Sequence, residues 1–244
     1  MRARAVQAEL VAAEPQRADP KAKHANPLIL RRRILRKLMM GSVGTLAATL
    51  FVIAPSAFAS SVGSCQLQGT ANFSPGLNSS AQPFSYNFGG NLSGCQSSEA
   101  GVPTSGAVEA GKTIAEQVMN SKTGATDTVT YQEPIPSGNG GCPSSTTSGS
   151  ALVTWADGTH TVESYSTTGA LAAVSLSGSV VPSLTLTAVN AQEGDPTTFT
   201  IATNRFAGDS ASGTLLFQPP EPTACNTPTG ATSATISGAV SLSN

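Results

Sequence analysis

Hydrophobic and polar residues alternate with a period of two over most of the chain after residue 60. Between Cys65 and Phe73 every second residue is apolar or small, and polar residues such as Gln66 and Gln68 take the positions between. The alternation returns at Phe84–Phe88. Successive side chains of a strand point to opposite faces, so the pattern predicts strands with one buried face. Further strands are predicted at residues 172–180, 184–188, 199–201, 215–217 and 234–242.

The clearest predicted hairpin runs from Val153 to Val162. Its centre is Asp157-Gly158, a dipeptide that tolerates the positive φ angles of a type I′ turn, and β-forming residues flank it on both sides. Gly89-Gly90 predicts a bulge or a sharp bend in an earlier strand.

Two segments depart from the alternation. Ile114–Met119 is the only helical candidate, because Ile114 and Val118 lie four residues apart. Residues 138–149 have no apolar alternation and are predicted to form a loop held by Cys142. About ten short strands separated by turn residues therefore predict one all-β domain over residues 60–244, an antiparallel sandwich or barrel.

Composition adds that the core of this domain is small. Residues 60–244 include only ten aromatic residues, whereas 55 residues are Ser or Thr. Strands that alternate Ser or Thr with small apolar residues suit an antiparallel sheet whose outer face meets water.

The first 59 residues have the order of an export signal. A cationic cluster, Arg31–Lys37, precedes an apolar run from Leu38 to Ile53, and Ala57-Phe58-Ala59 offers the small residues that a signal peptidase requires. The apolar run is shorter than the roughly 20 residues that span a bilayer, which favours cleavage over a membrane anchor. The arginines resemble a twin-arginine motif, so the export route stays open.

All four cysteines follow the predicted signal, which favours two disulfides in an oxidising compartment. In an antiparallel hairpin the start of one strand lies beside the end of the next. Cys65 opens the first predicted strand and Cys95 closes the second, so these two are expected to pair, which leaves Cys142 for Cys225. The cysteines are too far apart in sequence for a zinc site.

Charge divides the chain in the same place. Residues 1–59 hold ten Lys or Arg and three acids, whereas residues 60–244 hold three basic residues and eleven acids. We expect the acidic exported part to bind neither nucleic acid nor, after signal cleavage, a membrane surface.

No pattern in the exported part indicates a catalytic residue, a metal site or a cofactor. Gly208-Asp209-Ser210 resembles the nucleophile segment of some serine hydrolases, but the glycines or the downstream histidine of those families are missing. Asp157 and His160 flank a predicted turn, and His160 is the only exported histidine. Arg205 is expected to form a surface ion pair with Asp209, four residues away.

Trp155 and Tyr165 are the candidates for ligand contact. Both are expected to face the predicted hairpin, and aromatic rings of this kind can stack on a sugar. The alternative, that Trp155 anchors the core, is favoured because large aromatic residues dominate burial in small domains.

Three segments resemble a broad set of secreted, β-rich proteins of actinobacteria that have no established activity. They are the Ala57-Phe58-Ala59-Ser60 junction, the strand Cys65–Phe73 leading into Ser74-Pro75-Gly76-Leu77, and Leu92-Ser93-Gly94-Cys95. The resemblance implies a Gram-positive, extracellular setting and no particular mechanism.

The sequence therefore predicts a secreted, non-catalytic binding or structural protein of the extracellular space or cell envelope. Its partner is expected to be cell-wall polysaccharide or another secreted protein. Two alternatives stay open: a glycoside hydrolase that uses two carboxylates, and a protease inhibitor that presents the loop around Cys142.

The signal-peptide interpretation predicts the first residue of the mature protein. N-terminal sequencing of the exported protein should begin at Ser60, because Ala59 closes the small-residue cleavage site. Val62-Gly63-Ser64-Cys65 loosely resembles the cleavage motif of lipoproteins, so a sequence that begins at a lipidated Cys65, or one that begins before Leu38, would contradict it.

Overall fold

The structure, a computed structural model, describes residues 61–244, so the predicted leader and Ser60 lie outside the described residues. The described part is all-β, as predicted: it has thirteen strands, one short 3-10 helix and no α-helix. None of its helices is long and apolar enough to cross a membrane. The elements are β1 (Ser61–Leu77), β2 (Gln82–Ser97), β3 (Gly106–Ala110), β4 (Thr113–Met119), β5 (Thr126–Gln132), β6 (Ser137–Gly140), β7 (Ser144–Trp155), β8 (His160–Ala170), β9 (Ala173–Val181), β10 (Ser183–Ala188), β11 (Thr198–Ala202), β12 (Ser210–Gln218), η1 (Ala224–Asn226) and β13 (Ala231–Ser243).

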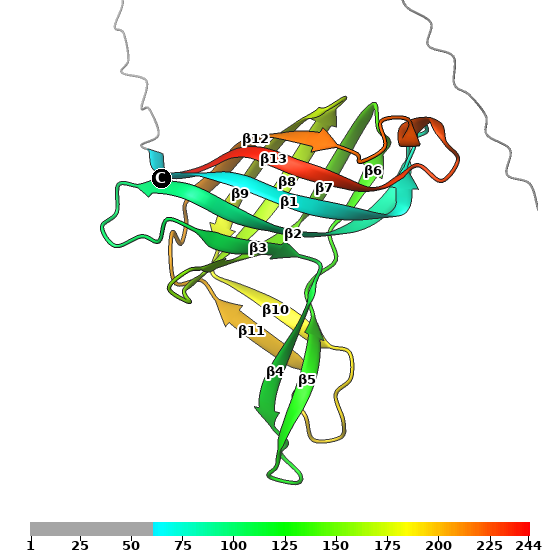
Figure 1. Cartoon of the computed structure of the whole chain (residues 1–244). Coiled ribbons are helices and arrows are strands. Elements are labelled where there is room, and N and C mark those ends of the chain that lie inside the picture. The colour runs from blue at the N-terminus through cyan, green and yellow to red at the C-terminus, as the bar shows by residue number, and fades with distance from the viewer. Residues whose placement is uncertain (1–60) are drawn as a thin grey trace, which may run out of the picture. The chain divides into compact units, whose positions relative to one another are not determined.

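Nine of the strands form an antiparallel barrel with eight wall positions (Figure 1). The wall runs β1-β13-β12-β9-β8-β7-β3-β2, and β2 pairs again with β1, which closes the ring. One wall position is shared, because β3 pairs with one half of β2 and β6 pairs with the other half. Closure leaves no open sheet edge along this wall.

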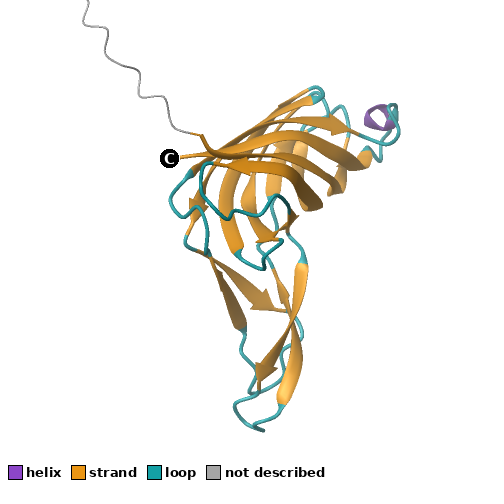
Figure 2. Cartoon of the chain, turned by 60° about the vertical axis from the view of Figure 1, so that its left-hand side comes forward, coloured by secondary structure: helices purple, strands orange, loops and turns teal. Residues whose placement is uncertain are grey.

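A second, four-stranded sheet is built from two excursions of the chain out of the barrel. The hairpin β4–β5 leaves between β3 and β6, and the hairpin β10–β11 leaves between β9 and β12. The two hairpins join as β11-β10-β5-β4, a curved half-barrel beside the outer face of the wall (Figure 2). Its inner face packs on two outward residues of the wall, Leu152 and Val162, through Val129, Leu184 and Leu186.

The main core fills part of the barrel interior. The predicted common face of the first strand is confirmed: Leu67 and Ala71 belong to this core, and Cys65 and Phe73 pack against it. Phe88 extends across two glycines that face each other on β1 and β2, since a Cβ at Gly69 or Gly90 would lie 2.4 or 2.8 Å from its ring. These glycines make room for the ring and form no bulge, so the bulge predicted at Gly89-Gly90 is absent.

Both predicted disulfides form. Cys65 and Cys95 join β1 to β2, with their Cα atoms 4.1 Å apart. The register of the two strands shifts here, so that Gly94 and Cys95 both lie opposite Cys65, and Gly94 takes a positive φ of 58°. A glycine in this conformation is typical of a bulge with one extra residue, which brings the two sulfurs together.

The second disulfide ties a turn of the barrel wall to a loop. Cys142 lies in the turn between β6 and β7, and Cys225 lies in η1, with Cα atoms 5.9 Å apart. The long loop predicted at residues 138–149 is therefore wrong, because most of these residues pair in the hairpin β6–β7. The hairpin consists mainly of Ser and Gly, so its sequence shows no alternation of apolar and polar residues.

Two other local features differ from the patterns considered in the sequence. The helical candidate Ile114–Met119, too short to count in the all-β prediction, belongs to a strand, in which Ile114 and Val118 share the inner face of the second sheet with Glu116 between them. The turn at Asp157-Gly158 is not type I′, since that turn needs a positive φ at both central residues and only Gly158 has one, at 80°. Gly158 N donates to Trp155 O, which gives a three-residue loop ending in a left-handed glycine.

The two disulfides are expected to contribute unequally to stability. In the loop-entropy relation, the Cys142–Cys225 separation of 83 residues gives about 4.5 kcal/mol and the Cys65–Cys95 separation of 30 residues about 3.6 kcal/mol. Urea unfolding should therefore show a larger loss of unfolding free energy for the pair Cys142→Ser and Cys225→Ser than for Cys65→Ser and Cys95→Ser. An equal or reversed order would contradict the expectation.

Candidate functional site

The barrel interior contains an apolar cavity of about 170 Å3. Its lining comes from every position of the wall and extends from Gly63 and Gln96 near one end to Leu77 and Phe84 near the other. An eight-stranded barrel is just wide enough either to be filled by side chains or to hold one small ligand. The inward residues decide between these two cases.

Small inward residues keep this barrel hollow. Ala71, Ala110, Ala151 and Ala211 line the cavity and project only a methyl group into it. Larger apolar residues on β9, β12 and β13 also line the cavity, and several stay only half-buried although they face the interior. This half-buried set is Val174, Leu176, Ile236, Val240 and Leu242.

A chain of hydroxyl groups crosses one region of the cavity wall. The Tyr86 and Tyr165 hydroxyls lie 2.7 Å apart, Tyr86 also contacts Thr147 Oγ1 at 3.1 Å, and Thr147 contacts Thr167 Oγ1 at 2.7 Å. Burial raises the pKa of both tyrosines, so both stay protonated at neutral pH. The four groups satisfy one another and present a fixed polar spot in an otherwise apolar lining.

Glu163 is the only acidic residue that lines the cavity. It faces inward from β8, and its pairing partners on the neighbouring strands are Ala151 and Val180. Its Oε1 atom is fully buried and has no hydrogen-bond partner. Burial raises the pKa of this carboxyl from 4.5 to about 7, and no Lys or Arg lines the cavity to offset the charge.

The two residues predicted for ligand contact both line this cavity. Trp155 is only 4% exposed, donates from Nε1 to Thr161 Oγ1 at 2.9 Å and packs edge-on against Phe206. It is therefore part of the core, as favoured from the sequence, and is no exposed platform. Tyr165 is half-buried and carries one end of the hydroxyl chain.

The other polar residues considered from the sequence do not line the cavity. Asp157 bonds to Arg205 and Thr159, not to His160, and Arg205 pairs with it instead of the predicted Asp209. His160 Nδ1 lies 3.3 Å from Thr154 Oγ1. Gly208 and Asp209 form a turn that leads into Ser210 at the start of β12. Within residues 61–244, no three acidic, histidine or cysteine side chains gather as a metal site would need.

Glu163, Tyr86 and Thr147 also line the cavity, but the sequence did not predict them as site residues. The usable signal was parity along β8: Thr161, Glu163, Tyr165 and Thr167 alternate with outward residues, so Glu163 shares the face of Tyr165. Comparison with protein-family models, with curated proteins and with solved structures finds no match to the chain.

The raised pKa of Glu163 predicts how stability depends on pH. The folded protein binds the proton more tightly than the unfolded chain, so the contribution is fully present below pH 4.5 and is lost as the pH rises through about 7. This pKa difference corresponds to about 3 kcal/mol. Glu163→Gln should remove that loss and be more stable than wild type at pH 8 by about this amount in urea unfolding.

A second buried acid, Glu133, is present in both proteins, so its titration cancels in the comparison. Its pKa is also raised by burial, but its Oε2 accepts a hydrogen bond from Lys112 N at the root of β4. Because both proteins keep Glu133, the difference between wild type and Glu163→Gln isolates Glu163. Equal pH dependence of the two proteins would contradict the assignment.

Proposed function

We propose that this chain is a non-catalytic binding protein of the extracellular space or cell envelope that holds one small, mainly apolar molecule inside its barrel. The observation that carries the proposal is the apolar cavity of about 170 Å3 with the unpaired carboxyl oxygen of Glu163 in its wall. Pockets that bind small molecules are typically apolar with a few placed polar groups.

The cavity volume limits the ligand to about the size of one aromatic ring. An engineered apolar cavity of about 150 Å3 in another protein takes up benzene, and the present cavity is slightly larger. Partly exposed walls of Val174, Leu176 and Ile236 offer apolar surface that such a ligand would cover. Covering this surface supplies the driving force.

The polar requirement on the ligand comes from Glu163. A buried oxygen without a partner costs free energy, and a ligand hydroxyl or amino group that donates to Oε1 would supply the missing hydrogen bond. The tyrosine and threonine hydroxyls already bond to one another and leave Glu163 as the group in need of a partner. The ligand is thus an apolar body with one hydrogen-bond donor.

The setting rests on the disulfides. Two disulfides and no free cysteine in residues 61–244 are typical of proteins from oxidising compartments. Export through the signal at residues 1–59, an extracellular or cell-wall location, and a partner such as polysaccharide or another secreted protein remain part of the proposal.

The geometry supports the two alternative functions less well. An inhibitor would need a projecting loop, but Cys142 lies in the short turn between β6 and β7. Two-carboxylate hydrolysis needs a pair of acids, and only one lines the barrel cavity; Glu109 and Glu116 line a separate groove outside the barrel.

A matched pair of ligands tests the proposal. Benzyl alcohol and ethylbenzene have equal numbers of non-hydrogen atoms, but only the alcohol can donate to Glu163. Both should bind the full-length protein with dissociation constants on the order of a millimolar or below. Calorimetry and the fluorescence of Trp155, the only tryptophan of the chain, measure the binding.

Two comparisons of variants separate the contribution of Glu163 to ligand affinity from that of the cavity itself. Replacing Glu163 with Met should lower the ratio of alcohol affinity to ethylbenzene affinity about tenfold, the value of one hydrogen bond to a charged group. Leu176→Phe fills the cavity and should abolish binding of both ligands, whereas Leu216→Phe, at a residue exposed outside the barrel, should not. Undiminished binding to Leu176→Phe would refute the barrel as the site.

A further inference from the structure

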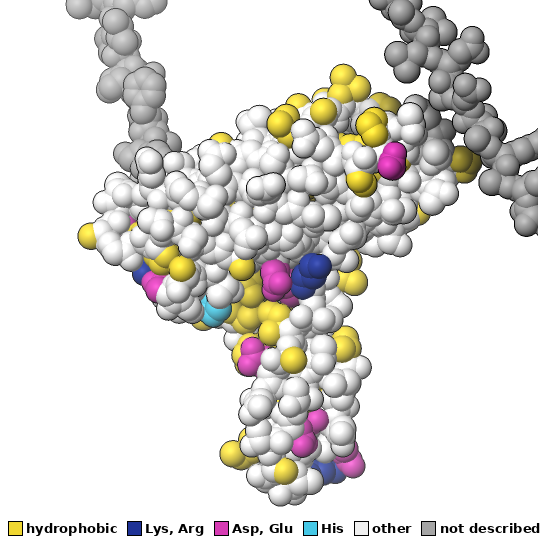
Figure 3. Space-filling view, in the orientation of Figure 1, with side chains coloured by type: hydrophobic (Ala, Val, Ile, Leu, Met, Phe, Trp, Pro, Cys, Tyr) yellow, Lys and Arg dark blue, Asp and Glu magenta, His cyan; other side chains and the backbone are white. Residues whose placement is uncertain are grey.

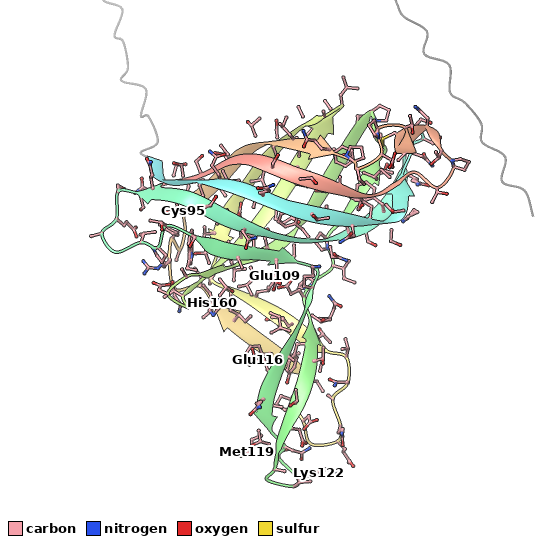
Figure 4. The ribbon with its side chains drawn as sticks, in the orientation of Figure 1. Cys95, Glu109, Glu116, Met119, Lys122 and His160 are labelled. Atoms are coloured by element: carbon pink, nitrogen blue, oxygen red, sulfur yellow. A yellow bond between two sulfur atoms is a disulfide. The ribbon has the colours of Figure 1, made fainter. Side chains whose placement is uncertain are left out.

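A second hollow lies outside the barrel, where the wall meets the four-stranded sheet. This groove has a volume of about 420 Å3. The barrel contributes residues of β3, β7 and β8, and the second sheet contributes residues of its two edge strands, β4 and β11. Figure 4 labels Glu109, Glu116 and His160 around this junction.

The groove runs along the open edge of β11. Four consecutive residues of this strand, Phe199–Ala202, line it. Because consecutive strand residues point to opposite faces, a hollow that touches all four must lie at the edge of the strand, where its backbone is accessible. β11 pairs only with β10 among the described strands.

The hydrogen bonds around β11 show which backbone groups face the groove. Ala188 N donates to Thr197 O, and Thr203 N donates to Pro182 O. In an antiparallel ladder, residues that bond to the neighbouring strand alternate with residues that do not. Phe199 and Ile201 therefore bond to β10, and the N–H and C=O groups of Thr200 and Ala202 point to the open edge.

The groove is both apolar and acidic. Ile114, Leu152, Phe199 and Ile201 give it an apolar floor, and hydrophobic side chains are visible there between acidic ones in Figure 3. Glu109 and Glu116 line it, neither has an ion-pair partner within residues 61–244, and no Lys or Arg lines it.

Lys112 lies over Gly89, the residue of β2 that pairs with Glu109, so its amine is near Glu109 although the two form no ion pair. Lys112 does not line the groove, and Glu116 lies on the neighbouring sheet. His160 lines the groove from the start of β8, with Nδ1 against Thr154 Oγ1. A partner with positive charge would therefore meet two carboxylates that form no ion pair with any described residue, of which Glu116 is the one farther from Lys112 in the fold.

We propose that this groove binds an extended peptide segment of another secreted protein, which adds as a strand to the edge of β11. Its main chain bonds to Thr200 and Ala202, and its groove-facing side chains alternate apolar residues with a Lys or Arg that meets Glu109 and Glu116. Strand addition takes its affinity from main-chain bonds and its specificity from alternate side chains.

Charge argues against a second copy of this chain as the occupant. Residues 60–244 contain three basic residues and eleven acids, so a copy would bring mainly acids to an acidic groove. Like charges brought together across an interface suppress the wrong partner. The occupant is therefore a different, basic and apolar segment.

Synthetic seven-residue peptides test this with the full-length protein. The probe is Thr-Val-Thr-Lys-Thr-Val-Thr with blocked ends and a fluorescent label, which places Val, Lys and Val on one face. Its binding, followed by fluorescence anisotropy, should be at least about tenfold tighter than that of the same peptide with Glu for Lys, by charge complementarity. A peptide N-methylated at alternate residues cannot pair through its backbone and should not bind.

Protein variants locate the contact. Glu109→Gln with Glu116→Gln should weaken probe binding about tenfold, whereas the matched pair Glu99→Gln with Glu221→Gln, in loops outside the groove, should not. Thr200→Pro removes the N–H that faces the open edge and should abolish probe binding while leaving ligand binding in the barrel unchanged. That readout separates this proposal from the barrel function and also reports folding.

Three results would overturn the proposal. The first is equal binding of the Lys and Glu peptides, and the second is undiminished binding of the N-methylated peptide. Neither result depends on a variant that folds. The third is a concentration-dependent dimer in sedimentation that Thr200→Pro disrupts, because it would make a second copy the occupant.

Discussion

The double pairing of β1 is the interaction on which the rest of the structure depends. β1 runs antiparallel to β13 on one side and to β2 on the other, and this closes the wall into a ring. Once the ring is closed, inside and outside follow from parity: alternate residues of each strand face the interior, which is mainly apolar with a few hydroxyl groups, and the residues between them face outward. The Cys65–Cys95 disulfide holds the same seam near the start of β1. Because many inward residues are Ala or Gly, closure produces a cavity and not a filled core.

The wall position shared by β3 and β6 gives the chain its second layer. The hairpin β4–β5 leaves where β3 ends and returns where β6 begins, and β10–β11 leaves from another part of the wall. Together they cover Leu152 and Val162, which would otherwise be apolar residues on the outside of the barrel. This second sheet does not close, so it keeps the edges that the barrel eliminates. The cavity therefore lies inside the sheet that closes on itself, and the groove lies along an edge of the sheet that stays open.

Parity along the strands could be predicted from the sequence, and most of the fold follows from it. The faces of Cys65–Phe73 and Phe84–Phe88, the hairpin around Asp157 and both disulfides required only alternation and antiparallel geometry. What alternation does not encode is which strands leave the wall. The run Ala151-Leu152-Val153 was the available signal, since three consecutive buried residues need cover on both faces of a strand.

The candidate site was hidden for a related reason. Sequence alone gives the parity of Glu163 but not whether that face is the inside or the outside, and an acid on a Ser-rich strand suggests the outside. Likewise Glu109 and Glu116 are separated by a turn and belong to different sheets, so only the three-dimensional arrangement brings both to one groove.

The buried acids Glu133 and Glu163 differ in how their surroundings account for them. Each has an unpaired, buried Oε1 atom. Glu133 uses its other oxygen to accept from Lys112 N, and its own N–H donates to Lys112 O, so it fixes the root of the β4–β5 excursion. Glu163 lies between Ala151 and Val180, where an apolar residue would pack without the cost of burying a carboxyl group. A structural role explains the first acid. The second has no partner for Oε1 among the described residues, and this is the basis of the proposal that a ligand in the cavity supplies one.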